Sequence, residues 1–249
     1  MDLNLDVGES FGVYTLGNDD VLLPYVTSAS VACGFHGGDP QIMARTVGLV
    51  KAHGVALGAH PGYPDLAGFG RRIIRMSEYE IENILLYQLG ALAAFARAQG
   101  VRLRHVKPHG ALYNFAAQDM PTARAVARAV TRFDSHLILV GQANSRLIDA
   151  AREFGLACAR EGFIDRAYRS DGSLLPRTER GAVVSSPARA VQVAMQLVRD
   201  KTVRAMDGTL LQLDVDTLCI HGDAAHALDT ARAVHEALRA GGVTLAPML

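Results

Sequence analysis

The chain has 249 residues, of which 49% are hydrophobic and 20% charged, a composition typical of a globular protein with a large core. Its 25 basic and 25 acidic residues give a formal net charge of +0, which argues against a nucleic-acid binder with a basic surface. The polar first ten residues predict no signal peptide, and three widely separated cysteines are typical of a reduced, cytoplasmic protein.

Short apolar runs, each bounded by glycine, proline or polar residues, recur along the chain and predict seven strands. They lie at residues 2–6, 30–33, 55–60, 105–109, 136–141, 156–161 and 215–221. Helical periodicity fills the intervals between most of these runs. The sequence therefore predicts regular alternation of strand and helix.

Two intervals have clear local signals. Ser77 and Glu80 have the spacing of a capping box, ahead of the apolar stretch 81–98. This stretch contains charged and amide side chains, so we interpret it as a buried helix and expect no membrane span. Residues 203–213 predict a β-hairpin that turns at Asp207-Gly208.

Alternation of strands and helices predicts one α/β domain over residues 1–249, with parallel strands joined by right-handed crossovers. Such a chain forms either a closed barrel or an open doubly wound sheet. No glycine-rich dinucleotide fingerprint follows the first strand, which favours the barrel.

Ionisable side chains follow or end most of the predicted strands, usually beside glycine. Because the enzymes with this barrel build their sites from loops at the carboxyl ends of several strands, we expect these side chains to share one cavity. The first strand also carries polar residues on one face, although strands covered by helices are normally apolar on both. The candidates are Asn4, Asp6, Glu9, His36, Asp39, His60, Lys107, His109, Glu161, Asp165, Arg166 and His221.

Several of these residue types have simpler explanations. A histidine on a helix or in the middle of a strand is usually structural, and we interpret His53, His105, His136, His226 and His235 in this way. A lysine within a strand is different, because lysine is rarely buried without a partner. The arginine pair at residues 71–72 follows a glycine-rich loop, a position that favours contact with an anion.

Six motifs together resemble the LamB/YcsF family. In chain order they are LNLDVGES, ASVACGFHGGDP, GAHPGYPDLAGFGRR, VKPHGALYN, EGFIDRAY and LCIHGD, and they span residues 3–223. Leu5 and Val7 depart from the family pattern, which often has cysteine and leucine there, but both lie on the apolar face of the first strand. The departures therefore leave the polar candidates untouched.

The resemblance implies a distorted (β/α)7 TIM-like barrel, related to glycoside hydrolases and polysaccharide deacetylases. It also implies the cleavage of 5-oxo-L-proline to L-glutamate, driven by ATP hydrolysis, in a complex with the 5-oxoprolinase subunits B and C. ATP is the implied cofactor, with Mg²⁺ bound to it as the expected divalent cation. No P-loop motif occurs, so either the nucleotide site is of another type or the partner subunits supply much of it.

Opening a lactam requires a general base for water, a cation for the substrate carboxylate and donors for the charge that develops on oxygen. We assign the base to Asp6 or His60, a proton-transfer role to His109, and charge stabilisation to Lys107. The expected substrate-binding residues are Asn4, Glu9, His36, Asp39, Arg71, Arg72, Tyr113, Asn114, Glu161, Asp165, Arg166 and His221.

Two other functions remain open from the sequence. The chain can be a stand-alone metal-dependent hydrolase or deacetylase acting on carbohydrate, with a cation at Asp6, His36 and His60. It can also be a non-catalytic subunit that binds substrate or partners. The density of ionisable groups at strand ends argues against the last function.

Overall fold

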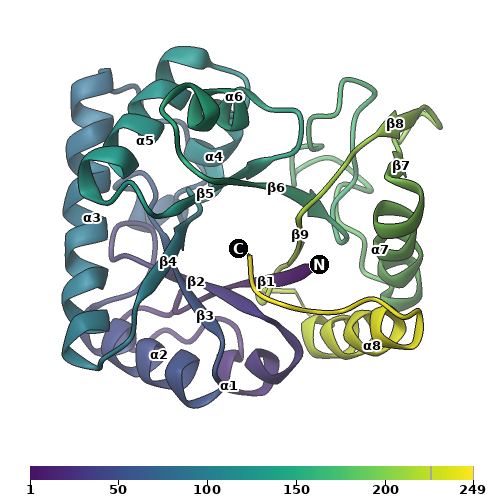
Figure 1. Ribbon diagram of the computed structural model, residues 1–249, viewed down its shortest axis with the longest axis horizontal. Helices are drawn as coiled ribbons and strands as arrows, with labels where there is room; N and C mark the ends of the chain where they lie inside the picture. The colour runs from purple at the N-terminus through teal and green to yellow at the C-terminus, as the bar shows by residue number, and fades with distance from the viewer. Residues whose placement is uncertain (225, 249) are drawn as a thin grey trace.

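The computed structural model describes residues 1–224 and 226–248 of the chain. Seven parallel strands close into a barrel in the order β1-β2-β3-β4-β5-β6-β9 (Figure 1), which confirms the predicted barrel. The predicted single domain over residues 1–249 includes residues 225 and 249, which lie outside the described ranges. The barrel strands are β1 (Asp2–Val7), β2 (Ser28–Ala32), β3 (Ala56–His60), β4 (Leu103–Val106), β5 (Ile138–Gln142), β6 (Cys158–Phe163) and β9 (Thr217–Ile220).

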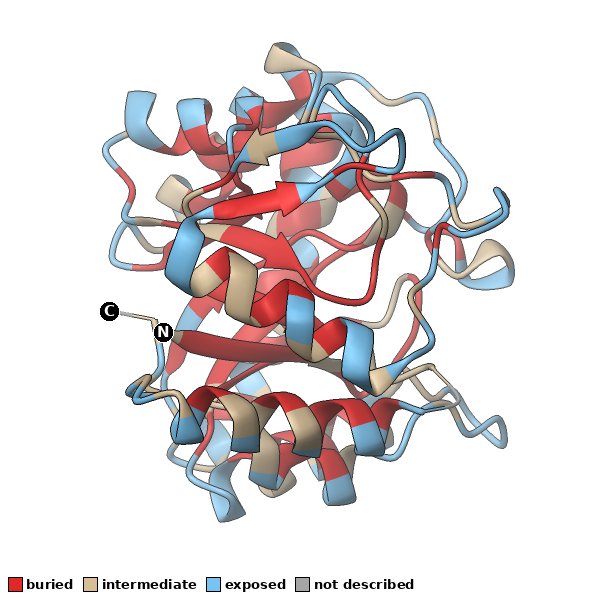
Figure 2. Cartoon of the chain, turned by 90° about the vertical axis from the view of Figure 1, so that its right-hand side faces the viewer, coloured by how far each residue is buried: buried red, intermediate tan, exposed pale blue. Residues whose placement is uncertain are grey.

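Helices surround the barrel, with their buried faces toward it and their exposed faces outward (Figure 2). They are α1 (Asp19–Leu22), α2 (Pro40–Ala52), α3 (Glu78–Ala98), α4 (Gly110–Ala116), α5 (Met120–Phe133), α6 (Arg146–Glu153), α7 (Pro187–Asp200) and α8 (Ala227–Ala240), with short 3₁₀ turns η1 (Leu23–Tyr25) and η2 (Leu66–Gly68). The predicted capping box at the start of α3 is formed by Ser77 and Glu80. No helix within the described ranges is long and apolar enough to cross a membrane.

The connection from β6 to β9 contains the part of the chain that departs most from regular alternation. It includes a long irregular segment, residues 164–186, followed by α7 and a small antiparallel sheet. This sheet pairs β7 (Thr202–Arg204) with β8 (Leu210–Gln212) outside the barrel. The seventh barrel strand is therefore β9, which pairs with both β6 and β1.

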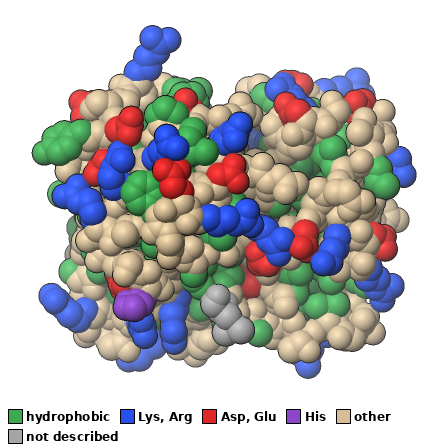
Figure 3. All heavy atoms as spheres, turned by 45° about the horizontal axis from the view of Figure 1, so that its top comes forward, with side chains coloured by type: hydrophobic (Ala, Val, Ile, Leu, Met, Phe, Trp, Pro, Cys, Tyr) green, Lys and Arg blue, Asp and Glu red, His purple; other side chains and the backbone are tan. Residues whose placement is uncertain are grey.

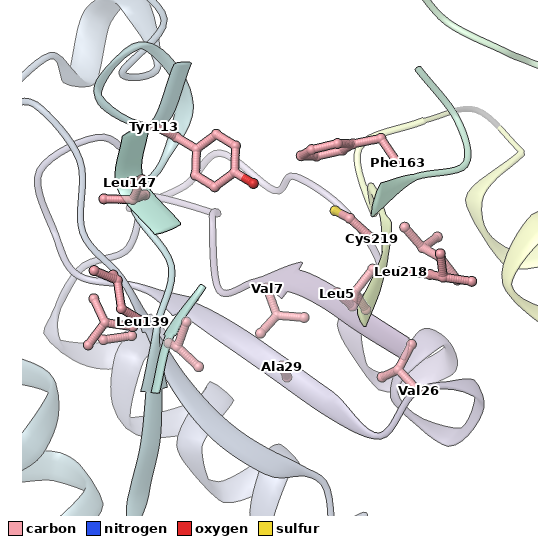
Figure 4. Packing of buried hydrophobic residues seen from close by; sticks show 14 of the residues in the cluster. Leu5, Val7, Val26, Ala29, Tyr113, Leu139, Leu147, Phe163, Leu218 and Cys219 are labelled. Carbon is pink, nitrogen blue, oxygen red and sulfur yellow. The ribbon is translucent and has the colours of Figure 1, made fainter. Parts of the chain in front are cut away.

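The hydrophobic core lies largely between the barrel and the helices. Leu3, Leu5 and Val7 of β1 are at most 1% exposed and belong to this core, part of which Figure 4 shows. The alternate residues of β1 are polar and are also largely buried. Because successive side chains of a strand point to opposite faces, the polar set faces the interior of the barrel.

The first polar residue of β1 is Asp2, which lies next to the N-terminus of the chain. It is nevertheless only 1% exposed. Its carboxylate accepts hydrogen bonds from the hydroxyls of Thr27 at 2.6 Å, Ser28 at 2.6 Å and Thr217 at 2.5 Å. Burial raises the pKa of Asp2, and these donors act in the opposite direction.

The fourth strand is displaced from its predicted position. The sequence places it over residues 105–109, but β4 ends at Val106, and the next residues run in an extended path to α4. The register between β3 and β4 shifts at Gly58, where an added Cβ would overlap the imidazole of His105. His105 therefore fills space that a side chain at residue 58 would need, and it bonds with Ser30 Oγ at 3.1 Å.

The face of the molecule that Figure 3 shows carries charged side chains of both signs. Basic and acidic side chains are interspersed over the face shown in Figure 3. This distribution agrees with the balanced composition of the chain.

Candidate active site

A pocket of about 530 Å³ lies at the carboxyl end of the barrel strands, where residues in or directly after β1, β3, β4, β5, β6 and β9 contribute side chains. The predicted site residues that line it are Asp6, Glu9, His60, Arg71, Lys107, His109, Tyr113, Asn114, Glu161, Arg166 and His221. Predicted residues from five of these strand ends thus gather around one cavity, as the barrel argument requires. Figure 4 shows the hydroxyl of Tyr113 and the sulfur of Cys219 pointing toward the same space from different sides of the barrel.

Two predicted substrate-binding residues lie outside the pocket. Asp39 is the N-cap of α2, and its carboxylate accepts from the backbone N–H groups of Gln41 at 2.8 Å and Ile42 at 3.0 Å. Arg72 pairs with Asp65, and its side chain is 67% exposed. Both therefore have local structural partners, and the structure assigns them no contact with the cavity.

Three further predicted residues stand behind the pocket wall and support residues that line it. Asn4 lies beneath the floor and bonds to Glu161 and Lys107. Asp165 holds His221, whose Nδ1 lies 2.8 Å from Asp165 Oδ1 and whose backbone N–H also donates to this carboxylate. His36 is fully buried behind His109.

Lys107 is the centre of a buried network that we call the lysine cluster, made of Lys107, Asn4, Asp6, Tyr113 and Glu161. The Nζ atom lies 2.6 Å from Asp6 Oδ1, 2.8 Å from Asn4 Oδ1 and 3.1 Å from Glu161 Oε1. The hydroxyl of Tyr113 donates to the other oxygen of Glu161 at 2.6 Å. The ammonium group thus donates to Asn4 and Glu161, whereas Asp6 Oδ1 contacts it as an ion pair without hydrogen-bond geometry.

These contacts limit what Lys107 can do. An ammonium group has three protons, and Nζ donates to Asn4 and Glu161 of the cluster and to Cys219 Sγ at 3.5 Å, so none is left to donate to a bound substrate. Burial alone lowers the pKa of Lys107, but the nearby charges of Asp6 and Glu161 outweigh it and hold the pKa well above its usual range. Lys107 therefore stays charged and positions Asp6, and any effect on a substrate acts through its charge.

A second group of buried side chains, the histidine cluster, consists of Glu9, His36, His60 and His109. His60 Nε2 lies 2.9 Å from His109 Nδ1, and Glu9 Oε1 lies 3.2 Å from His36 Nε2 and 3.4 Å from His109 Nδ1. The rings of His36 and His109 stack in parallel with their centroids 3.6 Å apart. One nitrogen or oxygen of each of the four residues lies within 4.8 Å of the others, which makes the cluster able to hold a metal ion.

The glycine-rich loop after β3 makes room for this stacked pair. Gly70 has φ +63°, and a Cβ there would fall 2.6 Å from His109 Cδ2 and 2.8 Å from His36 Cβ. A Cβ at Gly62 would lie 2.9 Å from His36 Nδ1. The glycines in the stretch 58–72 thus allow the backbone to close directly over the two rings.

The outer ring nitrogens of two cluster histidines are bonded to backbone carbonyls. His60 Nδ1 lies 2.7 Å from Lys107 O, and His109 Nε2 lies 2.8 Å from Phe69 O. A carbonyl only accepts, so these nitrogens carry the ring protons, and the inner nitrogens of the neutral rings are bare. Burial lowers the pKa of His109 and of His36 to about 3 and raises that of Glu9 to about 7.

Arginines and an aspartate surround the pocket mouth. Arg71 stacks on the ring of Phe69 at 4.8 Å and donates to Asp223 Oδ2 at 2.6 Å. Arg177 lies 4.0 Å from the same carboxylate oxygen. Arg166 donates mainly to backbone carbonyls of residues 175 and 182, so it shapes the wall as well as lining the pocket.

Several lining residues are absent from the set that the sequence predicts. They include Gln142 at the end of β5 and the wall residues Arg169, Leu174, Arg177 and Asp223. Asp223 has a signal, because it follows His221-Gly222 at a strand end. The wall segment 164–186 has only its length and its lack of periodicity, a combination that indicates a functional loop.

Comparisons with known proteins agree with this geometry. The model of the LamB/YcsF family matches residues 1–249. The chain is 52% identical to the A subunit of 5-oxoprolinase from Tolumonas auensis over 248 residues, covering 100% of this chain and 99% of that protein. It is 48% identical to the protein of the same name from Pyrococcus furiosus, covering 100% and 97% of the two chains.

Solved structures give the same answer. The crystal structure of a lactam utilization protein from Thermus thermophilus has a TM-score of 0.94 and 47% identity, covering 99% of each chain. A putative cellobiose-phosphate cleavage protein from Enterococcus faecalis has a TM-score of 0.56 at 13% identity, covering 99% and 97%, and shares only the fold. The chain therefore belongs to the LamB/YcsF family.

Proposed function

We propose that this chain is the ring-opening subunit of an ATP-dependent 5-oxoprolinase, which hydrolyses 5-oxo-L-proline to L-glutamate. The names of its relatives, the A subunit of 5-oxoprolinase and a lactam utilization protein, support this function. The observation that carries the proposal is the meeting of Asp6, His221 and Arg71 around one pocket, since they supply a base, a proton carrier and a cation.

The substrate carboxylate is bound at the mouth of the pocket. Arg71 and Arg177 both approach Asp223 there, so a carboxylate entering the mouth meets two guanidinium groups that already face an acid. The cavity of about 530 Å³ lies within the range of roughly 300–1,000 Å³ that holds drug-sized ligands. It therefore has space for the lactam together with a phosphoryl group.

Phosphorylation of the lactam oxygen by ATP makes the ring carbon electrophilic. The oxygen of water then bonds to that carbon, Asp6 takes a proton from the water, and the carbon–nitrogen bond breaks. The electron pair goes to nitrogen, which receives a proton through His221. A second water hydrolyses the resulting acyl phosphate, which leaves the side-chain carboxylate of L-glutamate and inorganic phosphate.

The geometry suits this division of roles. The proposed base and proton carrier face the same small volume. A carboxylate oxygen of Asp6, the sulfur of Cys219 and a ring nitrogen of His221 all lie within 4.8 Å of one another. Lys107 fixes Asp6, and Asp165 fixes His221. Two paired side chains thus point into the pocket with their orientations set by buried partners.

We place ATP and its Mg²⁺ mainly in the partner subunits B and C. This placement is supported by the sequence, in which no P-loop motif occurs. It also accounts for a chain whose relatives are named as one subunit of a larger enzyme. We propose that the assembled enzyme works in the cytoplasm.

Reconstitution tests the proposal. Glutamate formed from 5-oxo-L-proline and ATP is measured by chromatography for this chain alone, for the partner subunits alone, and for the mixture. We expect turnover only in the mixture, and phosphate release to match glutamate release. Glutamate formation by the partners without this chain would refute the ring-opening role.

A further inference from the structure

The histidine cluster has an excess of hydrogen-bond acceptors. Because the outer nitrogens of His60 and His109 hold the ring protons, their inner nitrogens face each other at 2.9 Å with no proton between them. Glu9 Oε1 approaches His109 Nδ1 at 3.4 Å, and Asp6 Oδ2 approaches His60 Nε2 at the same distance. Lone pairs that meet in a buried site repel one another unless a positive charge lies among them.

The positive charge among these lone pairs can be either a proton on one imidazole or a metal ion. An imidazolium here would be buried, stacked face to face on His36 and within about 5 Å of another ring. A charge on the ring of either His36 or His109 would be buried face to face with an uncharged ring, which is costly, so protonation is disfavoured. Neutral imidazoles are the form of histidine that binds a metal ion, so a metal ion is favoured instead.

The distances fit a coordination shell. Nitrogen and oxygen ligands lie about 2.0–2.2 Å from zinc, so neighbouring ligands of one ion lie roughly 3–3.5 Å apart. Three of the contacts among the four cluster residues are 2.9, 3.2 and 3.4 Å, and the candidate ligand atoms all lie within 4.8 Å of one another. The backbone carbonyls that accept from His60 and His109 are the outer partners that metal-binding histidines usually have.

We propose that Glu9, His36, His60 and His109 bind one divalent cation of the zinc class. His36 contributes Nε2, the ring nitrogen that lies 3.2 Å from Glu9 Oε1 within the cluster. Three imidazoles and one carboxylate suit zinc or cobalt better than magnesium, which prefers oxygen ligands.

The ion has one side open to the pocket. Glu9, His60 and His109 line the cavity, whereas His36 closes the cluster from behind. A water molecule on that open side would be activated by the ion, which can lower the pKa of bound water to about 7. Asp6 lies beside it to take the proton. This role of the water rests on the proposed lactam-opening function, but the binding of the ion does not.

Metal titration of the full chain tests the site. The protein is stripped with a chelator and dialysed, and Zn²⁺ or Co²⁺ is added, with bound metal measured by elemental analysis and the cobalt site by visible absorption. We expect one ion per chain, and affinity at least about 100-fold weaker in His36→Ala, His60→Ala and Glu9→Gln. His53→Ala, which changes an exposed histidine on another face, keeps wild-type affinity.

Each outcome decides the proposal. Absence of stoichiometric Zn²⁺ and Co²⁺ binding, or unchanged affinity in the cluster variants, would overturn it. The nearly isosteric Glu9→Gln keeps the test valid should an alanine variant fail to fold, as judged by circular dichroism in chelator. The chain can also bind the ion as expected and yet form no glutamate with its partner subunits. That result would refute the proposed function and would still support the metal site.

Discussion

The lysine cluster and the histidine cluster are both buried, adjacent and rich in polar atoms, but they differ in how their protons match their acceptors. In the lysine cluster the ammonium group of Lys107 donates to Asn4 and Glu161 and pairs with the charge of Asp6, and the hydroxyl of Tyr113 donates to Glu161. In the histidine cluster, acceptors of His60 and His109 meet each other. The first group contains its own positive charge, whereas the second brings acceptors together and, in our proposal, takes its positive charge from a metal ion.

The difference indicates which buried polar groups serve stability and which serve function. A fully matched network fixes one arrangement of the side chains, and removing a member leaves a buried charge without its partner. A network with surplus acceptors is costly by itself and is retained where a ligand completes it. Asp6 belongs to the first cluster and touches the second, so it connects them.

The largest effect is expected at this connecting residue. Asp6→Asn removes the proposed base and keeps the shape of the side chain, so turnover of the assembled enzyme should fall by roughly 10²–10⁴-fold. Initial rates of glutamate formation check this, with Asp39→Asn, at the N-cap of α2, as the control. Turnover by Asp6→Asn within a few-fold of wild type would remove Asp6 from the mechanism.

Lys107→Met should lower the free energy of unfolding by about 3–5 kcal/mol, because it leaves buried carboxylates without their cation. His109→Ala should cost less in the metal-free chain, since it also removes a contact between two acceptors. Urea unfolding of both variants in chelator measures the comparison. Equal losses would show that the two clusters do not differ as described.

His105 belongs to neither cluster, and it predicts how the free energy of unfolding depends on pH in acid. Burial, with a smaller effect of Lys107, lowers its pKa to about 3. The unfolded chain therefore binds a proton below pH 6.5 that the native chain does not, and stability falls toward pH 3 by about 1.4 kcal/mol per pH unit from this residue. In His105→Gln the slope of unfolding free energy between pH 6 and 4 should be shallower by that amount; an unchanged slope would contradict the neutral, buried ring.

The smallest effects concern two adjacent arginines. Arg71→Ala removes a guanidinium at the pocket mouth and should raise KM for 5-oxo-L-proline about tenfold, with little change in kcat. Arg72→Ala breaks only a pair with Asp65 outside the pocket and should leave KM within about twofold. Steady-state kinetics of both variants in the assembled enzyme separate them, and a larger effect at Arg72 would reverse the assignment.

The sequence predicts much of the barrel because the local pattern and the global fold agree. Alternation of Leu3, Leu5 and Val7 with polar residues in β1 reflects its two environments, and the polar face marks the interior of the barrel. The glycine-rich stretch 58–72 indicates a loop over the site, and its glycines do lie against buried histidine rings. Such signals depend on neighbouring residues, so they can be read from the chain.

The pairing of side chains across the barrel could not be predicted. Asp2 accepts from Thr217, which is 215 residues away, and no local pattern records this contact. The same holds for the three acceptors around Lys107, which hold the ammonium group beside Asp6. Asp39 shows a different difficulty. An aspartate that caps a helix and an aspartate that binds a substrate look alike in a sequence, and Asp39 is the N-cap of α2.

The irregular segment 164–186 forms the outer wall of the pocket without contributing a strand to the barrel. Arg166 fastens this segment internally through two backbone carbonyls, so its shape depends mainly on its own residues. Selectivity for one lactam over another can therefore be altered by exchanging a single peptide, while the reacting groups on the strands stay in register. The two properties are separable for evolution and for protein engineering alike.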